Sequence, residues 1–198
     1  TRSLVILDQN GLAIHDSFAP TPRAVPPTAD RDFFIVHRDR ADAGLFIGTT
    51  MRSRINGEWT IFASRRISRA DGSFGGIVVA AVAPEYFRMF YEKMNIGQHG
   101  AIGLISGNGF RLVRRPWLDA SVGVPVPGDL AQRLGATPSG VFLADSPNDG
   151  APRIVAHRRN ESTGLSVLVG LSKAEALAPW RRNMGILSAG AAVTLLLV

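Results

Sequence analysis

Hydrophobic and polar positions alternate over short segments that are separated by glycine-containing turns, which is the pattern of antiparallel strands. The clearest example runs from Arg52 to Val82, with turn signals at Asn56-Gly57 and Asp71-Gly72. Asn-Gly and Asp-Gly are preferred in tight hairpin turns because both dipeptides tolerate positive φ. An apolar-rich run follows the first turn and a continuous apolar run follows the second, so we predict three antiparallel strands in a meander.

A helical pattern follows this meander directly. Proline stands at position 84, where the first residue of a helix loses nothing by lacking an N–H group. Aromatic residues and Met94 then recur at helical spacing. The pattern predicts a helix from Pro84 to Asn95, and a shorter helix is predicted earlier, from Asp32 to Arg38.

The order of elements occurs twice along the chain. A hairpin over residues 3–17 turns at Asn10-Gly11, and a second hairpin over residues 101–115 turns at Asn108-Gly109. Further strands are predicted at 44–47, 140–144, 153–159 and 165–169, with Asp129 capping a short helix through Leu134 and another helix from Lys173 to Trp180. The pattern predicts an α+β fold of two tandem units, each an antiparallel sheet flanked by helices, over residues 1–96 and 97–180.

The C-terminal end of the sequence has a different character. Residues 184–198 carry no charge, and a membrane span needs about 20 apolar residues. We therefore interpret residues 181–198 as the start of a truncated transmembrane helix, preceded by Trp180, Arg181 and Arg182 as an interfacial anchor. The alternative is a buried helix of a soluble protein. The N-terminal end begins on an apolar strand without a signal peptide, so an upstream segment is expected.

Composition narrows the classes of function. The 198 residues are 45% hydrophobic and carry a net charge of +6, nearly all of it from arginine. The basic residues are not interleaved with stacking aromatics, which argues against a nucleic-acid partner. There is no cysteine, so disulfides, thiolate metal sites and cysteine nucleophiles are excluded.

Several short motifs, taken in their order along the chain, resemble those of one family. This family is the extracytoplasmic double Cache (PDC-like) sensor modules of bacterial transmembrane histidine kinases, diguanylate cyclases and chemoreceptors. The first unit is the clearer match. The stretches that carry the resemblance are residues 30–38 (DRDFFIVHR), 44–48 (GLFIG), 53–60 (SRINGEWT), 64–67 (SRRI) and 71–79 (DGSFGGIVV), with the turns at 8–11 (DQNG) and 106–109 (SGNG).

The resemblance implies a long helix before Thr1, five-stranded sheets, a homodimer, and a ligand pocket in the membrane-distal unit, residues 1–96. Amino-acid-binding members carry an arginine and an aromatic pair, whose positions Arg31 and Phe33-Phe34 would occupy, and later acidic residues that hold the ligand's ammonium. Those later positions fall at Arg52, Ser53 and Arg54 here, which suggests an anionic ligand, such as a small organic acid, in place of an amino acid. The resemblance places residues 1–180 in the periplasm, with the protein in the bacterial inner membrane and a histidine kinase or diguanylate cyclase as the output domain.

The residues themselves support an anion site. Arg52 and Arg54 alternate along one predicted strand and would share a face. A guanidinium group binds carboxylate in a bidentate manner and stays charged. The predicted ligand-binding set adds an apolar wall and further cations, and its members are Arg31, Phe34, His37, Arg52, Arg54, Trp59 and Arg65.

Each member of this set has a structural alternative. Arg65 and Arg66 would suit one structural ion pair with Asp71 and one solvated side chain. Arg52 and Arg54 are common as exposed strand residues, and His37 suits a local hydrogen bond.

Enzymatic and metal chemistry are not indicated. Ser64 lacks a nucleophile elbow, residues 72–76 are not a phosphate-binding loop, and the histidines lack metal-ligand spacing. We therefore expect no catalytic residue, no metal and no cofactor. The remaining alternatives are a stalk or dimerisation module that binds no ligand and an amino-acid-binding Cache sensor. If a ligand binds, we expect closure of the distal unit to shift the helix from Pro84 and to reorient the segment from Lys173.

Overall fold

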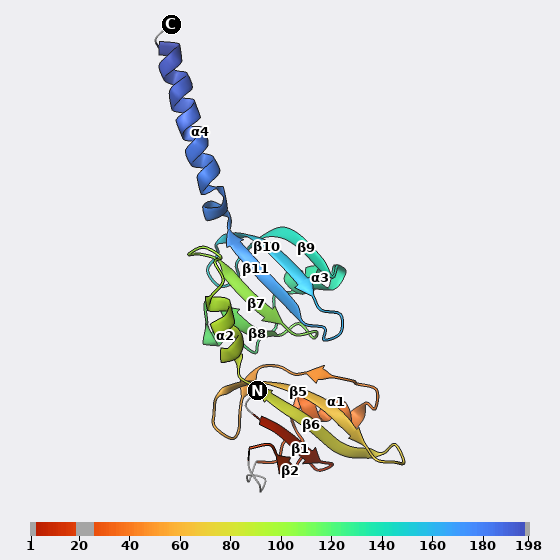
Figure 1. The fold of residues 1–198 in the computed structure, drawn as a ribbon. Coiled ribbons are helices and arrows are strands. Elements are labelled where there is room, and N and C mark those ends of the chain that lie inside the picture. The colour runs from red at the N-terminus through yellow and green to blue at the C-terminus, as the bar shows by residue number, and fades with distance from the viewer. Residues whose placement is uncertain (1–2, 19–25, 197–198) are drawn as a thin grey trace.

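The computed structural model describes residues 3–18 and 26–196, which form two antiparallel sheets followed by one long helix (Figure 1). The two sheets follow one another along the length of the molecule, and the helix α4 extends away from the second sheet. This arrangement confirms the predicted α+β fold with two antiparallel sheets.

The first sheet contains six strands within the described residues, in the order β2-β1-β6-β5-β3, with β4 also paired to β5. The observed sheet thus has one strand more than the expected five, because the short segment before the Asn56-Gly57 turn pairs with β5 as a separate strand. The strands are β1 (Ser3–Asp8), β2 (Ala13–Asp16), β3 (Phe46–Ile47), β4 (Met51–Arg52), β5 (Trp59–Ser68) and β6 (Phe74–Val82). The predicted meander is confirmed, since β4 pairs with β5 and β5 with β6, both antiparallel.

Helix α1 (Asp32–Asp39) covers one face of this sheet. Its buried side chains pack on residues of β1 and β6, where Val5 pairs with Val79 and Leu7 with Ile77. The side-chain alternation of these strands turns all four of these residues to the same face. That face therefore holds the hydrophobic core of the first unit.

The second sheet has five strands in the order β8-β7-β11-β10-β9. Its strands are β7 (Ala101–Ile105), β8 (Arg111–Arg115), β9 (Ser139–Asp145), β10 (Pro152–Arg159) and β11 (Ser166–Ser172), with a 3-10 turn at Asp119–Ser121. Helix α3 (Gly128–Ala136) follows Pro127, and no side chain caps it. The prediction that Asp129 caps this helix is wrong, because Asp129 lies inside the first turn.

Helix α2 (Pro84–Glu92) begins with proline as predicted and ends three residues before Asn95. It packs mainly against β8 of the second sheet and also contacts β5 of the first. Ile61 of β5 and Tyr91 of α2 belong to a single buried cluster with Leu112 of β8. Hydrophobic packing is therefore continuous between the two sheets. The predicted boundary between the two units, at residues 96 and 97, stays a prediction.

Polar contacts also join the two sheets. The Thr50 hydroxyl is buried and donates a hydrogen bond to the Leu112 carbonyl at 2.9 Å. Arg52 reaches Asp119 at 3.3 Å. The first sheet is therefore held to the second by a buried hydrogen bond as well as by apolar contact.

Helix α4 (Lys173–Leu196) is one continuous helix, longer than the predicted segment from Lys173 to Trp180. Within the described residues, no helix combines the length and the apolar character that a membrane crossing requires. The predicted start of a transmembrane helix at 181–198 is not supported on this criterion, and its last two residues lie outside the described part of the chain.

Candidate ligand site in the first sheet

A cavity of about 200 Å³ lies on the core face of the first sheet. Its floor is formed by alternate residues of adjacent strands, which project to one side because the side-chain period of a strand is two. Thr60 and Phe62 supply the β5 part of this floor. The residues that line the cavity are Ser3, Val5, Leu7, Asp16, Phe18, Thr28, Phe33, Ser53, Ile55, Asn56, Thr60, Phe62, Val79 and Ala81.

Asp16 is the one ionisable residue in this lining. It is only 6% exposed, and its Oδ1 accepts a hydrogen bond from the Phe18 N–H at 2.9 Å. No ion pair of Asp16 occurs within residues 3–18 and 26–196. Buried carboxylates are normally paired. Asp16 therefore offers the cavity a negative charge without a cationic partner from the described chain.

The sequence-predicted residues come from some of the same segments as the lining, but none of them lines this cavity. Phe33 faces it where Phe34 was predicted, and Thr60 faces it where Trp59 was predicted. Ser53, between the two predicted arginines, also lines it. On a strand, a shift of one residue moves a side chain to the opposite face. The strand alternation that places Thr60 and Phe62 on one side of β5 was the available signal for the face that lines this cavity.

Phe34 and His37 lie in the core beneath α1. Phe34 is fully buried and meets the Phe74 ring edge-on at 5.4 Å. The His37 Nε2 lies 3.0 Å from the Ser64 hydroxyl, which donates to the Phe33 carbonyl. Burial lowers the pKa of His37 and so favours its neutral form. In this structure both side chains stabilise the packing of α1 on the sheet.

Arg54 forms an ion pair at the surface. Its Nη1 and Nη2 lie 2.8 and 2.5 Å from the two carboxylate oxygens of Asp30, and Nη1 also donates to the Pro27 carbonyl at 2.6 Å. The hydrogen bond from Arg54 lowers the pKa of Asp30 to about 2. The prediction that Arg52 and Arg54 share a strand face is wrong, because β4 ends at Arg52 and Arg54 lies in the following turn.

Arg52 lies over the Trp59 ring, with its guanidinium carbon 4.7 Å from the ring centroid. It also donates to the Gly57 carbonyl at 3.0 Å and pairs with Asp119. A cation placed over an indole face is attracted by the ring quadrupole. Arg52 therefore packs on Trp59 within the first sheet and reaches Asp119 of the second unit, outside the cavity.

The two remaining predicted arginines have different environments. The Arg31 Nη1 lies 2.8 Å from the sulfur of Met51, which is a weak acceptor. Arg65 is exposed, whereas Arg66 donates to the carbonyls of His37 and Gly72. The suggested ion pair with Asp71 is not formed, because Arg66 caps backbone carbonyls. Arg31, His37, Arg52 and Arg54 have separate partners, and Arg65 is exposed. The role of these five side chains in ligand binding stays a prediction.

Comparisons with known proteins agree with this fold. A family model described as a histidine kinase sensor domain, of the double Cache type, matches residues 84–170. The match falls on α2 and the second sheet, although the first unit was expected to be the clearer match. No match was found among curated proteins.

Solved structures give longer matches. The extracellular domain of a protein described as a histidine kinase, rpHK1S-Z16, is 33% identical with a TM-score of 0.77, covering 89% of this chain and 73% of that one. The ligand-binding domain of the Pseudomonas aeruginosa PAO1 amino acid chemoreceptor PctB, in complex with L-Arg, is 16% identical with a TM-score of 0.65, covering 89% and 73%. The ligand-binding domain of the Pseudomonas fluorescens chemoreceptor CtaA, in complex with L-leucine, is 16% identical with a TM-score of 0.62. The match covers 88% of this chain and 72% of that one.

The fold and the core-face cavity define an extracellular sensor domain of the kind found in membrane receptors. More particularly, the chain belongs to the double Cache family of histidine kinase sensor domains. Domains of this family bind ligands and do not catalyse a reaction, so the chain is a sensor domain and not an enzyme.

Proposed function

We propose that this chain is the periplasmic ligand-sensing part of a bacterial inner-membrane receptor, and that its first sheet binds a small amino acid in the cavity beside Asp16. The observation that carries this proposal is the buried Asp16 carboxylate without a cationic partner in the described chain. An ammonium group placed there would supply the missing positive charge.

The lining favours an amino compound over the small organic acid that the sequence suggested. An organic acid would add a second negative charge to a cavity whose one ionisable lining residue is an aspartate. The apolar members of the lining, such as Val5, Leu7 and Phe62, suit an aliphatic side chain.

Arg31 is the candidate partner for the carboxylate of such a ligand. Its Nη1 contacts Met51, which pairs across the strands with the lining residue Thr60. The hydrogen bond from a guanidinium to a thioether sulfur is weak, so little free energy is lost when a carboxylate takes the place of the sulfur. The chemoreceptor domains described above as complexes with L-Arg and L-leucine support the same class of ligand.

Calorimetry of the chain with L-leucine, L-isoleucine, L-arginine and L-asparagine tests this function. At least one amino acid is expected to bind and to raise the melting temperature, because a ligand that binds only the folded state stabilises it. The matching carboxylate without its amino group is expected to bind at least tenfold more weakly, since it lacks the group that pairs with Asp16. Preference for the organic acid would restore the anion hypothesis, and no binding of any compound would favour a stalk.

The variant Asp16→Asn separates charge from shape. Asparagine keeps the acceptor for the Phe18 N–H but removes the negative charge, so amino-acid affinity is expected to fall at least tenfold. Asp42→Asn is the matched control, because Asp42 is an exposed partner of Arg40 on the surface. Unchanged affinity in Asp16→Asn would contradict the proposed role of Asp16.

The proposed signal passes from the first sheet through α2 to α4 and then to an output domain in the cytoplasm, a histidine kinase or a diguanylate cyclase. Contact of α2 with both β5 and β8 supports this route. In the proposed receptor, α4 leads toward the membrane. A ligand that prefers one arrangement of the sheets shifts the population toward it.

A homodimer is proposed for the receptor. Tyr86, Met89 and Phe90 expose 66, 51 and 57% of their surface on α2, and such neighbouring apolar side chains are typical of interaction surfaces. Light scattering of the full chain checks the state: a dimer is expected, and Phe90→Glu is expected to weaken it.

A further inference from the structure

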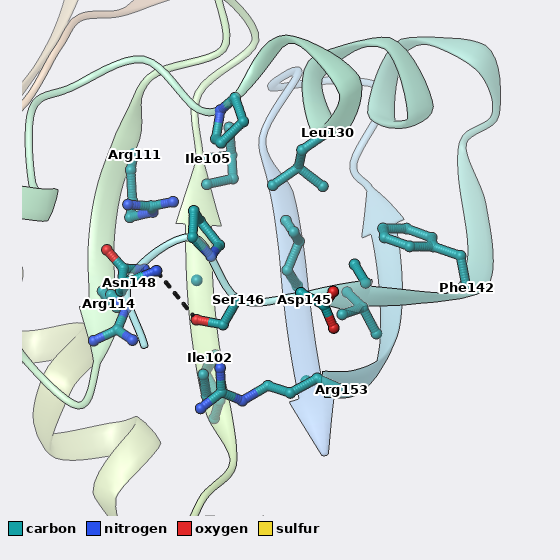
Figure 2. A pocket seen from close by; sticks show the side chains of 18 of the residues that line it. Ile102, Ile105, Arg111, Arg114, Leu130, Phe142, Asp145, Ser146, Asn148 and Arg153 are labelled. Atoms are coloured by element: carbon teal, nitrogen blue, oxygen red, sulfur yellow. Dashed lines mark hydrogen bonds between the residues drawn. The ribbon is translucent and has the colours of Figure 1, made fainter. Parts of the chain in front are cut away.

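A second cavity, of about 190 Å³, lies on one face of the second sheet under helix α3 and the loop after β9 (Figure 2). Two of its lining residues are arginines of β8, Arg111 and Arg114, which are 8 and 7% exposed. Arginine is almost never this deeply buried unless it is paired. The burial of Arg111 and Arg114 beside this cavity therefore requires a physical explanation.

A strand irregularity brings both arginines to this cavity. Residues three apart on a regular strand point to opposite faces. Here β8 pairs with β7 so that Arg111 opposes Ile105 and Arg114 opposes Gly103. Ile105 and Gly103 are two residues apart and share a face, and the register shift lies between Leu104 and Ile105. The bulge thus turns both guanidinium groups to one face, an effect that is typical of bulges near binding sites.

Neither arginine has an acidic partner within the described part of the chain. Arg111 donates one hydrogen bond, to the Ser121 carbonyl at 3.2 Å, and Arg114 donates one, to the Pro116 carbonyl at 2.8 Å. Each guanidinium has five N–H donors, so most of this capacity is left for another acceptor. Burial lowers the pKa of both arginines, and the positive charge of Arg114 lowers that of Arg111 further. The negative charge of Asp149 opposes this effect at Arg114 but does not cancel it.

A third arginine of the cavity shows the contrast. Arg153 is also buried, but its two terminal nitrogens lie 2.9 and 2.7 Å from the carboxylate oxygens of Asp149. The hydrogen bonds from Arg153 hold the pKa of Asp149 well below its usual range. Asp129 and Asp145 are exposed residues of the lining. Asp149 thus forms its direct ion pair with Arg153, and its charge acts on Arg114 only from a longer distance. Arg111 and Arg114 form no direct ion pair within the described residues.

The other walls of the cavity are apolar. Figure 2 shows Arg111 and Arg114 on one side and Phe142 on the opposite side, with Leu130 of α3 above. The floor includes Gly103, where an added Cβ would meet no atom closer than 3.8 Å. At about 190 Å³ the space is smaller than the roughly 300–1,000 Å³ of drug-sized ligand sites.

We propose that this second cavity binds a small aliphatic monocarboxylate, with its carboxylate on Arg111 and Arg114 and its hydrocarbon part against Leu130 and Phe142. Two converging guanidinium forks provide the strongest carboxylate recognition that side chains offer. The apolar walls exclude an inorganic anion as the best fit, because its remaining oxygens would be desolvated without partners. The site is separate from the Asp16 cavity and does not depend on the amino-acid proposal.

Calorimetric titration of the full chain with acetate, propionate, butyrate and inorganic phosphate tests this site. Affinity is expected to rise about fourfold for each added methylene up to butyrate, which is the effect of burying one CH₂ group. Phosphate is expected to bind at least tenfold more weakly than butyrate. Equal binding of all four anions, or no binding of butyrate at millimolar concentration, would overturn the proposal.

Two kinds of variant locate the binding. Arg111→Met and Arg114→Met are each expected to weaken butyrate binding at least tenfold while keeping or raising the melting temperature of the free protein, since a buried charge without a partner is removed. Gly103→Val fills the floor without replacing either arginine and is expected to abolish butyrate binding. This variant keeps the test decisive if an arginine variant fails to fold.

Asp16→Asn is the control that separates the two sites. It is expected to bind butyrate as the natural chain does, even where it no longer binds amino acids. Loss of butyrate binding in Asp16→Asn, or full binding in folded Gly103→Val, would show that butyrate does not occupy the second cavity.

Discussion

At the residue scale, the arginines of this chain differ in what they contact more than in where they lie in the sequence. Arg54 pairs with an exposed acid, Arg52 lies on an indole ring, and Arg66 donates to backbone carbonyls. Arg111 and Arg114 are buried without an acid. Clustering in the sequence therefore does not show which arginines are paired, because it carries no information on partners contributed by distant segments.

The pair of Asp30 and Arg54 leads to a prediction on acid stability. The pKa of Asp30 is lowered to about 2 in the folded chain, from an ordinary value of 3.8. A lowered carboxyl pKa stabilises the folded state fully above the unfolded value, and this stabilisation is lost as the pH falls through about 2. The free energy of unfolding of Arg54→Ala should therefore be lower than that of the natural chain above pH 4, and the difference should shrink toward pH 2.

Urea unfolding at several pH values between 7 and 2 measures this difference. Arg65→Ala is the control, because Arg65 is an exposed neighbour on β5, and it should keep the acid dependence of the natural chain. A difference for Arg54→Ala that stays constant from pH 5 to pH 2 would show that the ion pair does not shift the pKa of Asp30.

At the element scale, the first sheet depends on a close approach of β1 and β6. Gly76 has a φ of 131°, and a Cβ placed on it would lie 2.1 Å from the Leu7 carbonyl oxygen. Backbone atoms cannot move aside as a flexible side chain can. Both the positive φ and the contact therefore require glycine at this position.

Gly76→Ala should destabilise the chain by about 3 kcal/mol through backbone strain and overpacking against β1. Chemical denaturation measures the loss. Gly75→Ala is the matched control, since an added Cβ there would come no closer than 3.3 Å to the Arg69 side chain and the Ile67 carbonyl oxygen, and it should cost about 1 kcal/mol or less. A similar cost for the two variants would mean that the approach of β1 to β6 is not restrictive.

At the scale of the whole molecule, the two sheets share a buried cluster that includes Ile61 of β5 and Leu112 of β8. The tandem repeat predicted two units, each with its own sheet, but it gave no indication that one cluster would join them. We expect continuous packing of this kind to couple the stability of the two sheets.

We therefore expect one cooperative unfolding transition, with equal calorimetric and van't Hoff enthalpies. Ile61→Ala should lower the free energy of unfolding of the whole molecule by about 3 kcal/mol, because Ile61 is 4% exposed and its removal leaves a cavity between the sheets. Ile14→Ala, at a position that is 58% exposed, is the matched control and should have little effect. Two separate transitions would contradict this coupling.

The sequence by itself determined the elements of this protein and their order. Asn-Gly and Asp-Gly turns, strand alternation and Pro84 act over a few residues, so they are visible in one dimension. These local signals predicted the hairpins, the meander, α1 and the start of α2. The family resemblance followed from the same motifs in the same order.

Only the tertiary structure decided which side chains face a cavity and which are paired. The floor of the Asp16 cavity joins β1, β5 and β6, and its lining lies one residue away from the predicted set at Phe33 and Thr60. The register shift between Leu104 and Ile105 in the pairing of β7 with β8 decided the face of Arg111. Strand register and counter-charges come from residues far apart in the chain, and for that reason the two cavities could be identified only in the folded molecule.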